Sequence, residues 1–190
     1  MITPNSQLVQ AIGARLTGII RTSPIHETIE RIKAAKGTVL EEATARIDQA
    51  EGVRRAHALG FHHIAVSVAG FQSKTISGIR KLEGSTKLDV LIFCVCNTRV
   101  SKEDLKHIAM ADVACASASK LLRAEIGKKA MFQLGVTIPV YALTEKGKRL
   151  VLAYLAESAE ILVASRTSRL PYEADEKGPR LKDHPCHQKP

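Results

Sequence analysis

The sequence predicts an α/β protein: a three-layer sandwich with a mainly parallel, doubly wound sheet. After residue 60, stretches with strand composition alternate with stretches of helical spacing, the pattern of strands joined by crossover helices. Several strand candidates, such as residues 88–96, are continuously apolar, as parallel strands covered on both faces are. We therefore expect one α/β domain over residues 1–165, which is within the usual size of a single domain.

The first 45 residues are predicted to form two helices that pack on this sheet. Residues 6–16 carry apolar side chains four apart, which defines one face of a helix. Ser23 suits the N-cap of a second helix and Gly37 suits its end. Residues 37–40 predict a short strand, and residues 44–60 a third helix.

The remaining elements are predicted from composition and from residues typical of the ends of helices and strands. Ser101 and Asp104 form the pattern of a capping box at a helix start. Residues 166–190 are rich in proline and basic residues and poor in apolar ones, which predicts a flexible Pro-rich basic tail. The predicted strands are 62–69, 88–96, 112–116 and one or two within 130–143, and the predicted helices are 71–84, 101–110, 119–127 and 144–165.

Small polar residues follow these strands. In an open parallel sheet, ligands bind outside the carboxyl ends of the strands, so these residues are expected to gather at one edge. Hydroxyl groups and a lysine beside helix starts are suitable partners for a phosphate or carboxylate. A simpler alternative is that Ser117 or Ser119 only caps its helix. The expected edge comprises Gly70, Asn97, Thr98, Ser117, Ser119, Lys120 and Thr144.

Two further segments are candidates for covering such a pocket. Thr22 and Ser23 precede a helix start and offer hydroxyl groups, although helix capping explains them as well. Arg46 precedes another helix, in a loop, where ligand contacts are frequent. The alternative for Arg46 is a salt bridge with Asp48.

The four cysteines raise the question of a chemical site. Cys94 lies deep in an apolar run and is expected to be a core residue. Cys96 ends the strand near the helix start at Ser101, where a thiolate is favoured, so it is a candidate nucleophile or redox thiol. Cys115 lies on a neighbouring strand, but the common C-x-x-C spacing of metal sites is missing. We therefore assign no metal site from the sequence, and the cofactor stays unknown.

Bulk composition limits the partners. The formal net charge of +9 is spread thinly, and aromatic residues make up only 4%, which argues against nucleic acid binding. The start of the chain lacks a signal-peptide pattern, and no apolar run approaches the roughly 20 residues of a membrane span. We expect a cytoplasmic protein without a membrane partner. The alanine-rich helix over 145–164 leaves room for a homo-oligomer.

Several phrases, taken together, resemble a known family. These are "QLVQAIGARLTGIIRTSPIHETIERI", "ATARIDQAEGVRRAHALGF" and "ADVACASASKLLRAEIGKKAMFQLGVTIPVYALTEKGK". They resemble the methanogenesis marker protein 8 family of archaeal conserved proteins over roughly residues 5 to 158. The resemblance implies a link to methanogenesis and to maturation of a nickel-cofactor reductase, but it carries over no catalytic residues. It also implies a shortened relative, because family members are longer at the N-terminus and lack the tail.

Three functions are compatible with the sequence. The first is binding of a small anionic ligand or cofactor at the carboxyl edge of the sheet. The second is a thiol-dependent enzyme that uses Cys96. The third is an assembly or scaffold protein for a metalloenzyme. Whether the protein is an enzyme stays open at this point.

Overall fold

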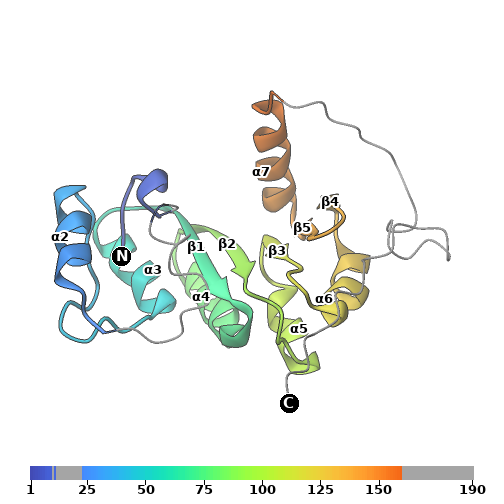
Figure 1. The fold of residues 1–190 in the computed structure, drawn as a ribbon, viewed down its shortest axis with the longest axis horizontal. Helices are drawn as coiled ribbons and strands as arrows, with labels where there is room; N and C mark the ends of the chain where they lie inside the picture. The colour runs from blue at the N-terminus through green and yellow to red at the C-terminus, as the bar shows by residue number, and fades with distance from the viewer. Residues whose placement is uncertain (10, 12–22, 160–190) are drawn as a thin grey trace, which may run out of the picture.

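A computed structural model of the chain describes residues 1–9, 11 and 23–159, with five strands in one open sheet (Figure 1). The strands are β1 (His63–Ala69), β2 (Asp89–Val95), β3 (Val113–Cys115), β4 (Phe132–Leu134) and β5 (Val140–Ala142). The helices are α2 (His26–Ala34), α3 (Gln49–Ala58), α4 (Lys74–Ser85), α5 (Lys102–Ile108), α6 (Lys120–Glu125) and α7 (Glu145–Ala156), with 3-10 helices η1 (Gly70–Gln72) and η2 (Gly127–Lys129). The prediction of a mixed α/β fold is confirmed.

The order of the strands across the sheet is β1-β2-β3-β5-β4. The first three are parallel, with Ser67 opposite Phe93 and Phe93 opposite Val113. β5 is antiparallel to both β3 and β4. The short segment between β4 and β5 allows a hairpin but not a crossover, which needs a dozen or more residues. The predicted parallel sheet is therefore confirmed for β1 to β3 only.

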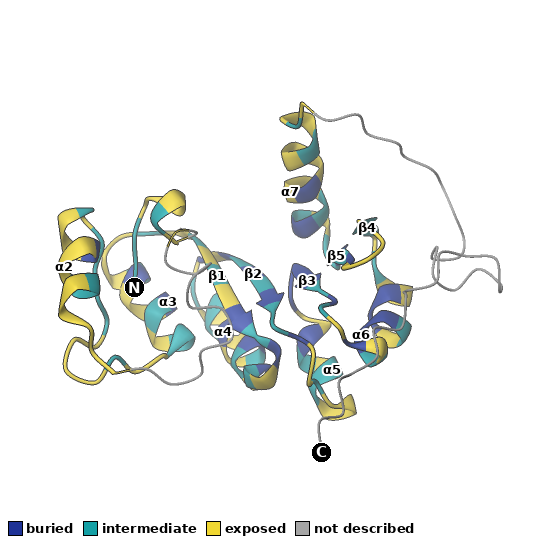
Figure 2. Ribbon diagram, viewed as in Figure 1, coloured by how far each residue is buried: buried dark blue, intermediate teal, exposed yellow. Residues whose placement is uncertain are grey.

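Four helices cover one face of this sheet. Because β1, β2 and β3 follow one another in space as in sequence, two right-handed crossovers place α4 and α5 on the same side. The main core lies there, and it includes Val53 of α3, Ile76 of α4, Ile108 of α5, Leu122 of α6 and Tyr141 of β5. The burial of these helices is seen in Figure 2.

The opposite face is covered in part. Val151 of α7 packs on Val113 and Ala142, over β3 and β5. Ala65 and Ser67 of β1 are exposed on this face, and Phe93 of β2 is half-buried. The described residues therefore do not confirm a doubly wound, three-layer sandwich, because both crossover helices share the other side.

The helices before the sheet differ in part from the prediction. α2 begins at His26 with Ile25 as its cap residue, so the prediction of Ser23 as the N-cap is wrong. The end at Gly37 is confirmed, because its backbone N–H bonds the carbonyl of Ile32 at 2.8 Å after the helix has ended. α2 lies beyond α3 from the sheet (Figure 1). The predicted strand over 37–40 is only a bridge between Thr38 and Ile2.

Two predicted segments reach past the described residues. Residues 6–9 and 11 are helical, and the rest of the helix predicted over 6–16 lies outside the described part. α7 ends at Ala156, so the helix predicted to residue 165 is shorter at least over 157–159. The predicted tail over 166–190 lies outside the described residues. Within the described ranges, we find no helix with the length and apolar character needed to cross a membrane.

Candidate functional site

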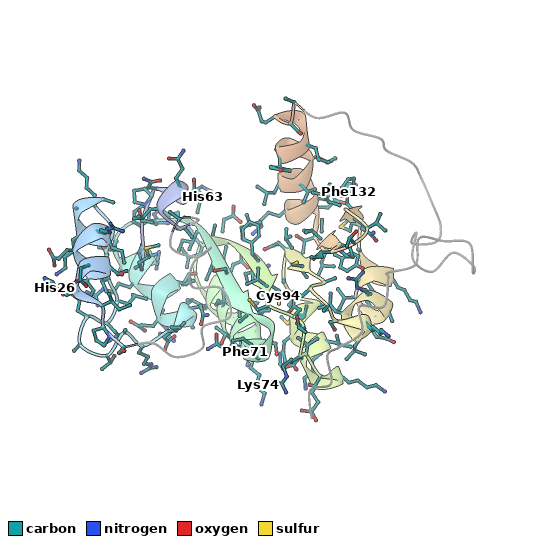
Figure 3. The ribbon with its side chains drawn as sticks, in the orientation of Figure 1. His26, His63, Phe71, Lys74, Cys94 and Phe132 are labelled. Atoms are coloured by element: carbon teal, nitrogen blue, oxygen red, sulfur yellow. The ribbon has the colours of Figure 1, made fainter. Side chains whose placement is uncertain are left out.

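One buried amide holds together the carboxyl ends of β2 and β3. Asn97 is fully buried. Its Nδ2 donates to the carbonyl oxygen of Cys94 at 3.1 Å and to that of Cys115 at 2.7 Å. Since these carbonyls belong to two neighbouring strands, the Asn97 side chain fixes the separation of the two loops that follow. Figure 3 shows this region around the labelled Cys94.

Ser117 completes the connection from the other strand. Its Oγ accepts a hydrogen bond from the backbone N–H of Asn97 at 3.1 Å. Its carbonyl oxygen accepts one from the buried guanidinium of Arg123 at 3.0 Å. Asn97 and Ser117, expected side by side from strand direction, are therefore in direct contact.

The backbone at this edge adopts an uncommon conformation twice. Cys96 has φ +55° and Ser117 has φ +49°. Non-glycine residues rarely adopt this left-handed region, and such residues concentrate at ligand sites. The conformation also means that Cys96 no longer follows the alternation of the strand, which ends at Val95. The strand predicted to end at residue 96 therefore ends one residue earlier.

The end of β1 approaches the same place. A Cβ atom on Gly70 would lie 2.1 Å from Asn97 Oδ1 and 2.6 Å from a methyl group of Val100. Only glycine fits such a close approach. The three parallel strands thus deliver Gly70, Asn97 and Ser117 to one edge.

The other predicted edge residues divide into structural and accessible ones. Ser119 is buried and its Oγ accepts from the N–H of Leu122 at 3.1 Å, so it caps α6. Thr98 and Lys120 are exposed at the same edge. Thr144 is at the opposite edge, where its Oγ1 donates to Asp112 Oδ1 at 2.6 Å. The prediction for Thr144 is wrong, because β5 runs antiparallel to β3 and so ends where β3 begins.

Of the residues proposed as covers, the structure describes Ser23 and Arg46. Thr22 lies outside the described residues, and Ser23 is exposed before α2. Arg46 forms a salt bridge with Asp48 at 2.6 Å, which is the alternative that the sequence left open. The helix that follows does reach the edge, because Gln49 Nε2 donates to Oε1 of Gln72 in η1 at 3.1 Å.

Sequence reasoning placed Lys120 at this edge but missed three further cations. Exposed basic side chains follow each parallel strand, within residues 70–74, 96–103 and 116–120. The same segments contain one acidic residue, Glu103. Within the described ranges, no ion pair of these cations is found. A count of charges within five to seven residues of each strand end would have found them. We call all four the edge cations: Lys74, Arg99, Lys102 and Lys120.

The start of α5 is already occupied by a carboxylate from its own first turn. Asp104 Oδ2 accepts from the N–H of Ser101 at 2.8 Å and from its hydroxyl at 2.7 Å, and Oδ1 accepts from Ser73 Oγ at 2.6 Å. Burial opposes ionisation of Asp104, but these hydrogen bonds outweigh it and lower its pKa. The predicted capping box is confirmed. The helix start is therefore not free to stabilise a thiolate at Cys96.

The thiols differ in their surroundings. Cys94 is fully buried, its Sγ lies 3.2 Å from Asn97 Oδ1, and burial raises the pKa of its thiol to about 12. Cys96 and Cys115 are half-buried, and Sγ of Cys115 lies 4.0 Å from Ser117 Oγ. Across residues 1–9, 11 and 23–159, no three His, Cys, Asp or Glu side chains are grouped to hold a metal ion. Cys186 lies outside that part of the chain.

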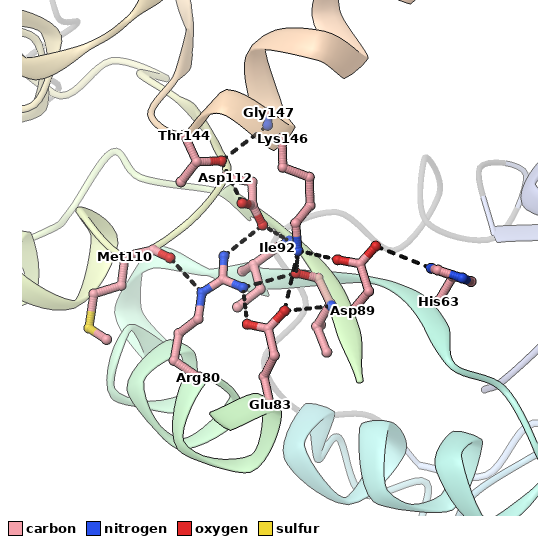
Figure 4. A network of polar contacts seen from close by, with 11 residues as sticks. His63, Arg80, Glu83, Asp89, Ile92, Met110, Asp112, Thr144, Lys146 and Gly147 are labelled. Atoms are coloured by element: carbon pink, nitrogen blue, oxygen red, sulfur yellow. Dashed lines mark hydrogen bonds and ion pairs between the residues drawn. The ribbon is translucent and has the colours of Figure 1, made fainter. Parts of the chain in front are cut away.

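The amino edge of the sheet is organised differently, around the buried Asp112 (Figure 4). Asp112 Oδ2 accepts from Arg80 at 2.6 Å and from the N–H of Ile92 at 2.7 Å, and Oδ1 accepts from Thr144. Arg80 also bonds Glu83 at 2.6 Å. Because every partner is itself part of the fold, this network joins α4, β2, β3 and α7.

The cations of this network are all neutralised. Lys146 contacts Glu83 at 3.2 Å and also pairs with Asp89, whose second oxygen lies 3.1 Å from His63 Nδ1. Burial opposes the ionisation of Glu83, but the N–H of Val90 and Arg80 outweigh it and lower its pKa. The amino edge is therefore a structural ion network, whereas no ion pair of the edge cations is found among residues 1–9, 11 and 23–159.

Comparison with known proteins finds similarity to proteins conserved in archaea. Residues 1–156 match a family described as "Uncharacterized protein conserved in archaea (DUF2099)". An uncharacterised protein of Methanocaldococcus jannaschii is 38% identical over 166 residues, which cover 86% of this chain and 57% of that protein. The chain thus spans little more than half the length of this curated relative. No solved structure matches. On the extent of the family match, the chain belongs to the DUF2099 family of proteins conserved in archaea.

Proposed function

We propose that this protein binds a small anionic ligand or cofactor at the carboxyl edge of β1, β2 and β3. The observation that carries the proposal is that each of the three parallel strands is followed, at this edge, by an exposed cation for which no ion pair is found among the described residues. Arg80 and Lys146 at the amino edge are paired with carboxylates. The edge cations have no such partner among the described residues, and Lys74, Lys102 and Lys120 are the first residues of α4, α5 and α6. Cations without a carboxylate partner attract anions to the surface on which they lie.

The predicted site residues have two kinds of role in this proposal. The side chains of Asn97 and Ser119 form hydrogen bonds with other groups of the fold, so they position the loops. Thr98 and Lys120 are exposed and are the direct contacts, together with the half-buried Ser117. Thr22, Ser23 and Arg46 stay candidates for closing over the ligand.

Isothermal titration with inorganic phosphate, pyrophosphate and citrate tests this proposal. Lys74 and Lys81 lie two turns apart on α4, about 10 Å along the helix axis, and both are exposed. Lys74→Ala and Lys120→Ala should weaken binding by about two- to fivefold each, whereas the matched control Lys81→Ala should not. Raising the salt concentration should weaken the binding of each anion to the unaltered protein, because salt screens the attraction between exposed charges.

Two results would contradict the proposal. One is a lack of binding by all three anions at low ionic strength. The other is an equal loss of affinity in Lys74→Ala and Lys81→Ala, which would indicate attraction by net charge alone rather than a site at the edge.

The left-handed backbone of Cys96 favours a second candidate, a thiol-dependent enzyme. Held at φ +55° and half-buried, Cys96 is presented at the edge beside Thr98. This candidate requires fast alkylation of native Cys96 near neutral pH and loss of the activity in Cys96→Ser. Labelling at the rate of Cys94, which is fully buried, would remove it.

The family resemblance extends the proposal beyond the site. It supports a cytoplasmic role linked to methanogenesis or to maturation of a metallocofactor, with assembly of a metalloenzyme as an alternative. Purification of the tagged protein from an anaerobic archaeal extract would test this, with the enriched partner identified by mass spectrometry.

A further layer over the exposed face of β1 and β2 would complete the predicted three-layer sandwich and could come from a second copy.

A further inference from the structure

An apolar pocket lies between the partly covered face of the sheet and α7. Its volume is about 370 Å³, within the range of small-molecule pockets. At roughly 30 Å³ per water-sized group, it has room for about a dozen non-hydrogen atoms. Its walls come from β2, β3, β5 and α7 and include Phe93, Val95, Cys115, Val140, Val151 and Tyr154.

The side chains on the helical wall are incompletely buried. Leu150 is 37% exposed and Tyr154 is 66% exposed. Apolar side chains that surround a concavity and stay accessible are characteristic of a binding site. No charged side chain is among the residues that line the pocket, so it suits the uncharged, apolar part of a ligand.

The pocket is continuous with the edge that carries the proposed anion site. Val95 and Cys115 line it, and each is the last residue of its strand. Sγ of Cys115 lies 4.0 Å from Oγ of Ser117, which bonds Asn97. One end of the pocket therefore lies where β2 and β3 end, and the segments that continue from there carry Arg99, Lys102 and Lys120.

We propose that the ligand is an amphipathic organic anion, with an apolar body in this pocket and its charged group at the carboxyl edge. The inference rests on the proposed function, because it takes the anion site from it and adds the chemistry of the rest of the molecule. Charge complementarity supports this occupant: no charged side chain lines the pocket, and the edge cations Arg99, Lys102 and Lys120 follow the two strands whose last residues, Val95 and Cys115, line it.

A series of alkyl phosphates below their micellar concentrations tests the inference on the full chain. Titration would compare inorganic phosphate, butyl phosphate and octyl phosphate, with octanol as the neutral counterpart. Affinity should rise with chain length by up to about fourfold per buried methylene. Octyl phosphate should bind more tightly than octanol, because only the phosphate ester carries the charge that the edge attracts.

A matched pair of variants tests whether the apolar part of the ligand binds in the pocket. Leu150→Trp fills the pocket from α7 and should remove the gain in affinity of octyl phosphate over inorganic phosphate. Leu152→Trp makes the same change on the same helix, at a residue that is 45% exposed and does not line the pocket, and should keep the gain. Circular dichroism and the binding of inorganic phosphate check that both variants are folded.

The results separate the two proposals. Equal affinity for inorganic phosphate and octyl phosphate would overturn the amphipathic ligand and leave the anion site standing. Equal affinity for octanol and octyl phosphate, unaffected by Lys120→Ala, would overturn the anion site and with it this inference. Concentration-dependent dimerisation that Leu150→Trp abolishes, without any effect of chain length, would also overturn it and assign the face to a second copy.

Discussion

Replacing Asn97 by alanine should destabilise the protein more than any other single truncation at the carboxyl edge. The change removes two hydrogen bonds, one to the buried carbonyl group of Cys94 and one to the partly buried carbonyl group of Cys115. An unsatisfied buried group costs about 1 to 3 kcal/mol. We therefore expect Asn97→Ala to lower the free energy of unfolding by about 2 to 4 kcal/mol, since two groups lose their donor.

Urea denaturation, followed by circular dichroism, measures this loss as a change in midpoint at constant slope. Thr98→Ala is the matched control, because Thr98 is the exposed neighbour of the buried amide and should change stability by about 0.5 kcal/mol at most. A loss below about 1 kcal/mol in Asn97→Ala would refute the reasoning, because the amide would then not be what holds the ends of β2 and β3 together.

Three further outcomes follow from the structure. Gly147→Ala should destabilise the fold by about 1 to 3 kcal/mol in the same denaturation assay, because the new Cβ would lie 2.1 Å from the carbonyl oxygen of Asp112. An unchanged midpoint would show that α7 packs differently. The pKa of Glu83 is lowered in the folded state, so its contribution is present above about pH 4.3 and is lost as pH falls through its folded pKa. Calorimetric melting of Glu83→Gln from pH 7 to pH 2 should therefore show a weaker loss of stability towards acid than the unaltered protein, and equal slopes would contradict this. Cys94, with a pKa of about 12 and full burial, should react with iodoacetamide at pH 8 far more slowly than Cys96, as read by mass spectrometry; equal rates would mean that the core opens at that strand.

The position of the edge was accessible from the sequence because it depends on local signals. Continuous apolar runs predict buried strands, and the small polar residues directly after them mark the points where the strands end. Parallel pairing of β2 and β3 then brings Asn97 and Ser117 together, as their hydrogen bond shows. The caps at Ser101 and Ser119 were likewise predictable, because a cap is a contact within four residues.

Most of the wrong or missing predictions concern contacts between segments that are far apart in the sequence. The prediction for Thr144 is wrong because the residues of 138–143 carry no local signal that distinguishes a parallel from an antiparallel pairing with β3. The residue type of Ser23 suits a cap, but α2 begins at His26. Asp112 gave no signal, since its role depends on Arg80 and Thr144, each 32 residues away.

The sequence by itself determined which segments become strands and helices, where the parallel strands end and which small polar residues lie there. It did so because backbone propensity, apolar spacing and helix caps act over a few residues. Only the tertiary structure decided which cations are neutralised, that Cys96 and Ser117 adopt left-handed backbones, and that one face of the sheet holds an apolar pocket against α7. Those features depend on which strands become neighbours and on which side their connections pass, and that is settled by packing across the whole domain.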